Sequence, residues 1–255
     1  VIGGSLIVGD SVRASLRQMT MSRLGGITQA LNSPRFFREA LAGEILIAAT
    51  ASPKEAHAAP AMLLPGSVEK KTSTGELRRA ASVTILGLKA VDWSMLDSLD
   101  VAAPSDSGIV LGYKTATELG AVVGDSVSVW VELPSSIPRD SLLGEREETS
   151  IEIVLNVDGV LSEDAGASRF SLQPAQQLPY NAFVSLATFQ QRLNLEERIA
   201  SRRNPIARLA RINTILFGSS QRTNSTEIGT SDQLMRLFES DKNDATRLQT
   251  ELKKK

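Results

Sequence analysis

The stretch that decides the fold is Ile109-Val-Leu-Gly-Tyr-Lys-Thr-Ala-Thr-Glu-Leu-Gly120, followed by Val123-Gly-Asp-Ser-Val127. Its first three residues are aliphatic and predict a short strand. The residues from Thr115 to Leu119 predict a helix of one or two turns, and Gly120 is a residue type that commonly ends a helix. The segment Ser126–Leu133 then alternates in period two, which predicts another strand. A strand, a short helix and a strand in close succession indicate a domain that mixes both element types.

Further strands and turns are predicted on both sides of this stretch. Runs of aliphatic and β-branched residues predict strands at Glu44–Thr50, Ser82–Val91, Ile151–Val157, Asn181–Ser185 and Arg211–Phe217. The segment Lys70–Gly75 predicts a hairpin turn. The segment Ala51–Pro65 contains three prolines and much alanine, and this composition predicts a loop.

Amphipathic helices are predicted at both ends of the chain. The first, Asp10–Leu31, carries apolar residues at helical spacings, and Gly25-Gly26 weakens its middle. The closing helix, Ser231–Lys253, has a short heptad seam, which fits packing against another helix or packing on a sheet. Other helices are predicted at Pro34–Leu41, Leu186–Leu195 and Glu196–Arg211.

The composition excludes several functional classes. The 255 residues suffice for one large domain or two small ones. The 28 Lys and Arg residues nearly balance the 29 Asp and Glu residues, so the net charge of −1 argues against a dedicated nucleic-acid binder. The absence of Cys excludes disulfides, thiolate zinc sites and a Cys nucleophile. The single His removes His-rich metal sites.

Motifs for catalysis or cofactor binding are mostly absent, so we expect no cofactor, no metal site and no catalytic centre. No glycine-rich phosphate loop and no Gly-x-Ser-x-Gly elbow occurs. Ser67 and Lys70 match the Ser-x-x-Lys spacing, but a chance match is the better interpretation. His57 is expected to be a solvated loop residue. A basic cluster has two interpretations, a contact with an anionic lipid, a partner or RNA, and a solvated helix face. Its members are Arg198, Arg202, Arg203, Arg208 and Arg211.

The sequence leaves the membrane question open at its first residues. No window supplies the roughly 20 consecutive apolar residues that a spanning helix needs. The segment Val1–Gly9 is either the last turns of a membrane helix that lies upstream or a buried start of a strand or helix.

The order of several phrases resembles one family of membrane proteins. Leu6–Leu16, followed by Arg23-Leu-Gly25, resembles the segment that leaves the first transmembrane helix in bacterial ABC-transporter permeases of the MacB/FtsX/LolC group. Leu111–Gly120, running into Val123–Val127, resembles a phrase of the MacB-like periplasmic core domain.

Two later phrases extend the resemblance in the same order. Pro134–Gly144 is similar to a loop of one long-permease branch, and Asn181–Gln190 resembles a late strand-and-helix element. The sequence departs from the simple family pattern at residues 51–82 and in the loop Pro134–Glu148. The exact subfamily and the cargo therefore stay open.

The resemblance implies an α+β fold, with a mixed α/β porter-like domain, a second small α/β subdomain and terminal stalk helices. We expect residues 1–43 to form an N-terminal stalk helix and its cap, continuing from a membrane helix. Residues 44–218 are expected to form the extracytoplasmic core, and residues 219–255 a linker and a C-terminal amphipathic helix.

The resemblance also implies a function in transport rather than catalysis. The expected role is that of a periplasmic permease domain at the bacterial inner membrane, which couples ATP-driven motion of the membrane helices to cargo or a partner (mechanotransmission). Implied partners are a cytoplasmic ABC ATPase, the membrane through helices outside this chain, and an accessory protein or cargo, with no nucleic acid. The alternatives are a periplasmic serine hydrolase using Ser67 and Lys70, and a stand-alone binding module.

Two sets of residues are expected to carry this function. The predicted stalk and coupling residues are Asp10, Arg13, Leu16, Leu234, Phe238 and Leu248. The predicted partner-facing loop residues are Pro134, Pro138, Arg139 and Asp140.

Overall fold

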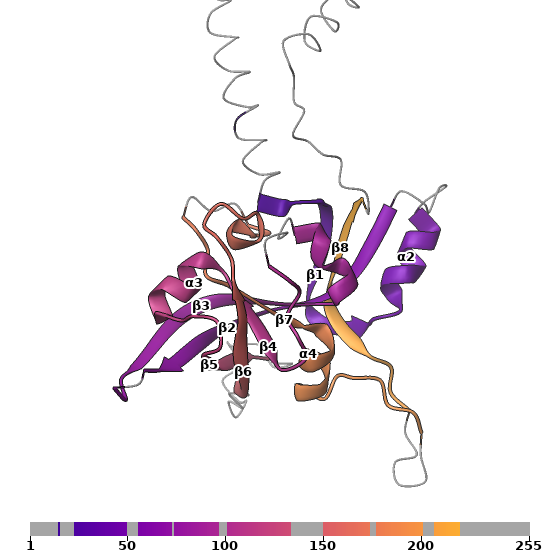
Figure 1. Ribbon diagram of the computed structural model, residues 1–255. Coiled ribbons are helices and arrows are strands. Elements are labelled where there is room, and N and C mark those ends of the chain that lie inside the picture. The colour runs from indigo at the N-terminus through magenta and orange to yellow at the C-terminus, as the bar shows by residue number, and fades with distance from the viewer. Residues whose placement is uncertain are drawn as a thin grey trace, which may run out of the picture. The chain divides into compact units, whose positions relative to one another are not determined.

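The computed structural model describes residue 15 and residues 23–49, 56–72, 74–96, 101–133, 150–173, 177–200 and 207–219. These residues combine one eight-stranded sheet with short helices, so the predicted α+β class is confirmed (Figure 1). The predicted closing helix Ser231–Lys253, the loop Pro134–Glu148 and most of the predicted first helix up to residue 22 lie outside the described residues. The predicted division at residues 43 and 218 stays a prediction.

Eight strands are interspersed with helices along the described residues. The strands are β1 (Ile27–Arg38), β2 (Ala56–Lys71), β3 (Leu77–Leu88), β4 (Gly108–Leu111), β5 (Ser126–Glu132), β6 (Ser150–Val160), β7 (Asn181–Ser185) and β8 (Arg211–Ser219). The helices are α2 (Leu41–Ala49), α3 (Tyr113–Leu119) and α4 (Leu186–Arg192), with the 3-10 turns η1 (Ala90–Leu96) and η2 (Ala167–Arg169).

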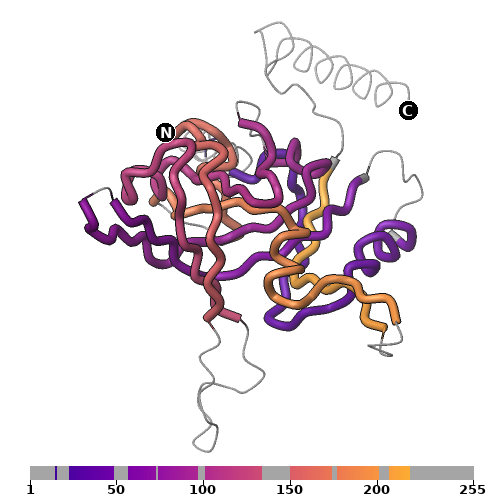
Figure 2. Tube along the Cα trace, turned by 60° about the horizontal axis from the view of Figure 1, so that its bottom comes forward, coloured from indigo at the N-terminus to yellow at the C-terminus, as the bar shows by residue number. Residues whose placement is uncertain are grey.

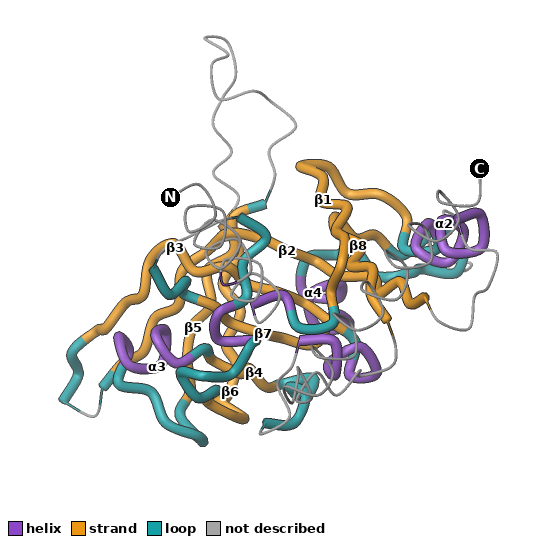
Figure 3. The backbone as a smooth tube through the Cα atoms, turned by 90° about the horizontal axis from the view of Figure 1, so that it is seen from above, coloured by secondary structure: helices purple, strands orange, loops and turns teal. Residues whose placement is uncertain are grey.

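Six of the strands close into a ring. The sheet order is β1-β8-β2-β3-β7-β4-β6-β5, and an additional pairing joins β5 back to β2. The strands β2, β3, β7, β4, β6 and β5 therefore have a bonded neighbour on both sides, and closure of this kind removes exposed edges. The strands β8 and β1 extend the sheet beyond the ring, and we call them the flank. Figure 3 shows β1 and β8 side by side, away from α3.

The long strand β2 belongs to both regions. One of its edges pairs with β8 over residues 56–61 and with β5 over residues 66–69, while the other edge pairs with β3 over residues 61–71. Figure 2 follows this violet trace from β8 to the hairpin with β3. Pro65 lies in the gap between the partners β8 and β5, and Pro60 lies just before the first residue that pairs with β3. Both prolines therefore occupy places where a missing N–H costs little.

A side chain fills the gap in the ladder between β8 and β5. The amide of Asn213 on β8 accepts a hydrogen bond from the Leu63 N–H (2.8 Å) and donates one to the Leu63 carbonyl (2.8 Å). Asn213 is 3% exposed. The side chain thus replaces a backbone partner at the point where β2 leaves the flank and enters the ring, and no buried backbone group is left unpaired there.

The apolar side chains form two clusters on opposite faces of the sheet. On β3, Val83 and Ile85 belong to the first cluster, whereas Leu86 and Leu88 belong to the second. On β7, Val184 belongs to the first cluster and Phe183 to the second. This alternation follows from the period of two along a strand. The first cluster is covered by α3 and α4, and the second by η1 and the segment around Phe170.

The prediction was correct for most of the ring, with β2 as the exception. The hairpin turn between β2 and β3, the strands β4, β5, β6 and β7, and the helices α3 and α4 all lie where the sequence predicted them. Gly120 ends α3 with φ +59°, in the left-handed region that favours glycine, as predicted. The strand β8 is also confirmed.

The prediction was wrong for the two segments that precede the ring. Residues from Ile27 onward form β1 rather than a continuing helix, because the left-handed Gly25 (φ +59°) breaks the helical turn at residues 23–24. The predicted helix Pro34–Leu41 is instead the end of β1, where a bulge between Asn32 and Phe37 accommodates Pro34. The predicted strand Glu44–Thr50 is instead helix α2.

Two further corrections concern β2 and the basic segment. The predicted loop Ala51–Pro65 is strand β2 from Ala56 onward, because both prolines sit beside gaps in the ladder. The predicted helix Glu196–Arg211 is not a helix in its described part: Arg198 and Arg208 pair as an isolated antiparallel bridge, and β8 begins at Arg211.

Candidate functional site

The structure does not describe the residues that the sequence predicted as sites. The coupling residues Asp10, Arg13, Leu16, Leu234, Phe238 and Leu248 and the loop residues Pro134, Pro138, Arg139 and Asp140 lie outside the described residues. Their roles stay predictions. Three places in the described residues carry features that bear on function.

The first place is where the chain enters and leaves the sheet, which we call the junction. Ile27, the first residue of β1, pairs with Gly218 near the end of β8. The Gly26 N–H donates a hydrogen bond to the Met95 carbonyl of η1 (2.8 Å). A side chain at position 218 would overlap the Gly26 carbonyl oxygen, so glycine allows the two segments to approach closely.

A partly buried hydrogen-bonded pair, His57 and Asp92, lies next to the junction and corrects the interpretation of His57. His57 is on β2, opposite Gly218 of β8, rather than in a loop. Its Nε2 lies 2.6 Å from Oδ1 of Asp92, the acidic residue of η1. Asp92 is 2% exposed, and its Oδ2 has no hydrogen-bond partner among the described residues. A separation of 35 residues hid this pair from sequence reasoning.

Trp93 links η1 to the middle of the sheet. Its indole N–H donates to the Val101 carbonyl (2.8 Å), and its ring meets Phe183 of β7 edge to face at 5.4 Å. Such an aromatic contact adds about 1 kcal/mol to the burial of the rings. The chain of contacts from Gly26 through η1 to β7 therefore connects the junction to the ring.

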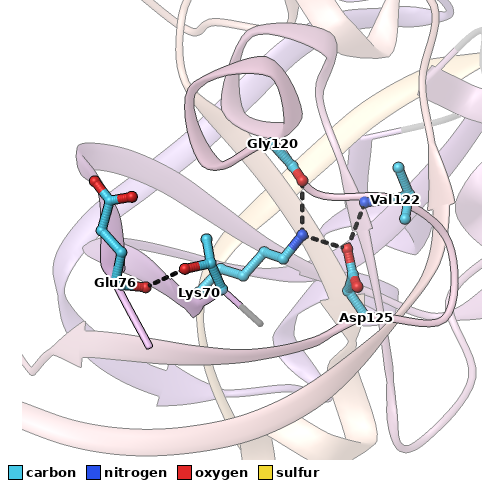
Figure 4. Close-up of polar contacts among 6 residues, drawn as sticks. Lys70, Glu76, Gly120, Val122 and Asp125 are labelled. Carbon is cyan, nitrogen blue, oxygen red and sulfur yellow. Dashed lines mark hydrogen bonds and ion pairs between the residues drawn. The ribbon is translucent and has the colours of Figure 1, made fainter. Parts of the chain in front are cut away.

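The second place is the segment Ile109–Val127, which includes Gly120 and Asp125. The Lys70 ammonium on β2 lies 2.6 Å from the Gly120 carbonyl and 2.6 Å from Oδ2 of Asp125 (Figure 4). The same carboxylate oxygen accepts the Val122 N–H (2.7 Å). The hydrogen bond from Lys70, followed by that from Val122, holds the pKa of Asp125 below its usual value. These hydrogen bonds thus hold the end of α3 against the β2–β3 hairpin.

Ser67 and Lys70 are not brought together as a catalytic pair. Ser67 Oγ accepts a hydrogen bond from Arg79 on β3 (3.1 Å), and the Lys70 ammonium is engaged with Gly120 and Asp125. Residues three apart on a strand point to opposite faces of the sheet. The geometry therefore gives no support to the serine-hydrolase alternative.

The third place is a groove of about 380 Å³ at the far end of the flank. The end of β1 contributes Phe36, Phe37 and Arg38 to its walls, and the segment entering β8 contributes Ala207–Leu209 and Arg211. Two members of the predicted basic cluster, Arg208 and Arg211, therefore line one groove, while Arg202 and Arg203 lie outside the described residues. The aromatic part was missed because the sequence predicted a helix there.

Searches for metal sites and membrane spans among the described residues gave no positive result. No group of three His, Cys, Asp or Glu side chains in the described ranges could hold a metal ion. No described helix is long and apolar enough to cross a membrane.

Comparison with known proteins finds similarity at the level of structure. No family model matches the chain, and no curated protein matches it. The chain is similar to the periplasmic region of MacB from Actinobacillus actinomycetemcomitans, with a TM-score of 0.40 and 13% identity over 86% of each chain. It is also similar to a domain provisionally named as a permease protein from Porphyromonas gingivalis, with a TM-score of 0.38 and 10% identity over 87% of this chain and 85% of that one.

Both similar structures are permease domains of the kind that the sequence resembles. At a TM-score below 0.5 the likeness carries no argument about function. The function proposed below therefore rests on the residues of this chain.

Proposed function

We propose that this chain is the extracytoplasmic domain of an ABC-transporter permease, inserted between two membrane helices, and that it passes ATP-driven motion to cargo or a partner outside the membrane. The observation that carries the proposal is the pairing of Ile27 with Gly218. A domain inserted between two helices must receive and return the chain at one place, and β1 begins where β8 ends. The family order of the sequence phrases supports the same role.

The contacts at the junction provide a route for motion. A displacement of residues 23–26 acts on η1 through the hydrogen bond from Gly26 to Met95. The turn η1 is held to β2 by the His57–Asp92 pair and to β7 by Trp93. Because packed interiors are close to incompressible, a displacement of η1 is passed on to the sheet rather than absorbed.

The proposal does not require catalysis by this chain. ATP hydrolysis belongs to a cytoplasmic ATPase partner in the full transport system, and the domain contributes a rigid body that is moved. A rigid ring suits this task, since each of its strands is bonded on both sides.

The test uses the full-length protein that carries this chain, reconstituted with its ATPase in nanodiscs. A four-residue Gly-Ser-Gly-Ser insertion between Gly26 and Ile27 lengthens the junction. The matched control places the same insertion between Thr74 and Gly75, in the turn joining β2 and β3. The readout is an environment-sensitive dye on Val154→Cys, which lies on β6 and is 58% exposed; this chain contains no Cys of its own.

We expect ATP to change the dye signal in the parent protein and in the control, and to change it at least fivefold less in the junction variant. The ATPase rates of all three proteins should agree within about twofold. An equal ATP response in the junction variant contradicts transmission through the junction. Labelling of Val154→Cys by a membrane-impermeant maleimide only after cell lysis contradicts the extracytoplasmic location.

A further inference from the structure

The groove at the far end of the flank combines aromatic and cationic walls. Phe36 and Phe37 are partly buried, and both pack against the first apolar cluster, so their rings are held in place. Leu209 is 57% exposed on the opposite wall. Fixed rings that face an exposed aliphatic side chain offer apolar surface to a bound side chain.

The charge of the groove is positive and incompletely neutralised. No acidic residue is among those that line it. Arg211 makes no side-chain hydrogen bond or ion pair with the described residues. Arg208 donates a hydrogen bond to the Asn194 carbonyl, and its Nε is buried without a partner among the described residues. Arg38 is paired with Glu44 (2.6 Å).

The acidic side chains near the groove are engaged elsewhere. Glu39 is bound by Lys89 (2.5 Å) and by the amide of Gln190 (2.7 Å). Glu196 binds Arg198 (2.7 Å), and this hydrogen bond holds the pKa of Glu196 below its usual value. Each of these two carboxylates already has a cationic partner outside the groove, which leaves Arg211 available for an external anion.

The groove lies along the outer strand of the sheet. Within the described residues β1 pairs only with β8, so the backbone groups on its other edge have no strand partner. A strand edge of this kind binds extended peptides through main-chain hydrogen bonds, while adjacent grooves select the side chains. The bulge at Pro34 confines regular pairing to the two ends of β1.

The position of the groove decides between two sources of a bound anion, a lipid headgroup and a soluble partner. Arg38 pairs with Arg211 at one end of the flank, and Ile27 pairs with Gly218 at the other. The seven residue steps of β8 between these pairs span about 23 Å. If the proposed function holds, the membrane lies at the Ile27 end, so the groove is well beyond the reach of lipid headgroups and faces soluble partners.

We propose that this groove binds an extended acidic peptide segment, carrying an aromatic or aliphatic side chain, from a soluble partner protein. A peptide carboxylate pairs with Arg211, the apolar side chain of the peptide packs against Phe36, Phe37 and Leu209, and its backbone bonds to the edge of β1. The choice of a protein over a lipid rests on the proposed function. The aromatic and cationic character of the groove does not depend on the proposed function.

The test measures peptide binding to the 255-residue chain by fluorescence polarisation. The probe is a labelled pool of hexapeptides with four Glu residues and one Phe or Leu, compared with a pool in which Gln replaces Glu. Vesicles of phosphatidylglycerol and of phosphatidylcholine are tested beside them. The variant is Arg211→Gln, and the matched control is Arg192→Gln, an exposed arginine on α4 outside the groove.

We expect the acidic pool to bind at least tenfold more tightly than the Gln pool, and Arg211→Gln to weaken binding at least fivefold while Arg192→Gln leaves it within twofold. Equal binding of the two pools, equal loss in both variants, or no binding at 1 mM peptide overturns the proposal. Binding of phosphatidylglycerol vesicles in place of peptide also overturns it and assigns the groove to lipid. Since no ATPase is present, failure here leaves the junction experiment unaffected.

Discussion

The ring and the flank are built from the same sheet but differ in how their strands are held. Every ring strand has two bonded neighbours, whereas β1 has one among the described residues. The ring buries aliphatic side chains at alternate positions of its strands, such as Val127, Val129 and Val131 on β5. In β1, by contrast, most residues are exposed. The difference indicates a division of labour, in which the ring supplies rigidity and the flank supplies the junction and the groove.

The two regions meet along one strand, and this makes their separation testable. Close to its midpoint β2 exchanges β8 for β5, with Gly66 on the ring side and Leu63 at the gap. A change in the ring half should destabilise the whole domain, whereas a change in the flank should cost much less. Three substitutions sharpen or break this comparison.

Gly66→Ala should have the largest effect. An added Cβ would overlap the Trp130 carbonyl oxygen of β5 and lie 2.6 Å from the Ile85 side chain, so β2 and β5 could not close the ring. We expect the free energy of unfolding to fall by about 3 kcal/mol, measured by urea denaturation.

The control for this change is Gly43→Ala in helix α2, which belongs to the flank side of the chain. Nothing lies within 4 Å of the added methyl group, and alanine favours the helix by about 0.5–1 kcal/mol. The same substitution should therefore stabilise one region and destabilise the other. A loss of similar size at both positions would remove the distinction between ring and flank.

Asn213→Leu should have the next largest effect, because it removes the link between the two regions. The substitution leaves the N–H and the carbonyl of Leu63 buried without partners, which costs about 2–4 kcal/mol. Circular dichroism during thermal unfolding measures the loss. Gln29→Leu on exposed β1 serves as the control and should change the stability by less than about 0.5 kcal/mol. Two separate unfolding transitions in Asn213→Leu would show that Asn213 couples the regions.

Asp125→Asn should have the smallest effect, about 1 kcal/mol at pH 7, because the pair with Lys70 is partly exposed. The folded state lowers the pKa of Asp125 from 3.8, so the unfolded chain binds more protons. The carboxylate therefore stabilises the fold above that pH, and its contribution disappears as the pH falls through the folded-state pKa. Urea midpoints of both proteins at several pH values should converge at acidic pH. A difference that persists unchanged in acid contradicts the assigned pair.

Most of the ring was predictable because the hydrophobic period and the turn residues of its sequence indicate the same elements. The segment Ser126–Glu132 alternates in period two and is a strand with one buried face, and Gly120 ends α3 as its residue type suggests. The segments that precede the ring, β1 and α2, were not predictable because tertiary contacts override local preference there. The segment Leu41–Ala49 has the apolar run of a strand, but Leu41, Ala42 and Ile45 share one helical face that packs against the first cluster.

The candidate sites were hidden for related reasons. The His57–Asp92 pair needs the knowledge that β2 begins before its prolines, and the groove needs the pairing of Arg38 with Arg211. Both depend on strand partners far apart in the sequence, and local periodicity does not report such partners. The basic cluster was visible, but its fixed aromatic neighbours were not.

The pairing of Ile27 with Gly218 also has a consequence for protein engineering. Since these residues are neighbours across two strands, a linker of a few residues could join them, and new termini could open in the turn between β2 and β3. The described core is therefore a candidate for circular permutation and for transplantation into a surface loop of an unrelated host protein.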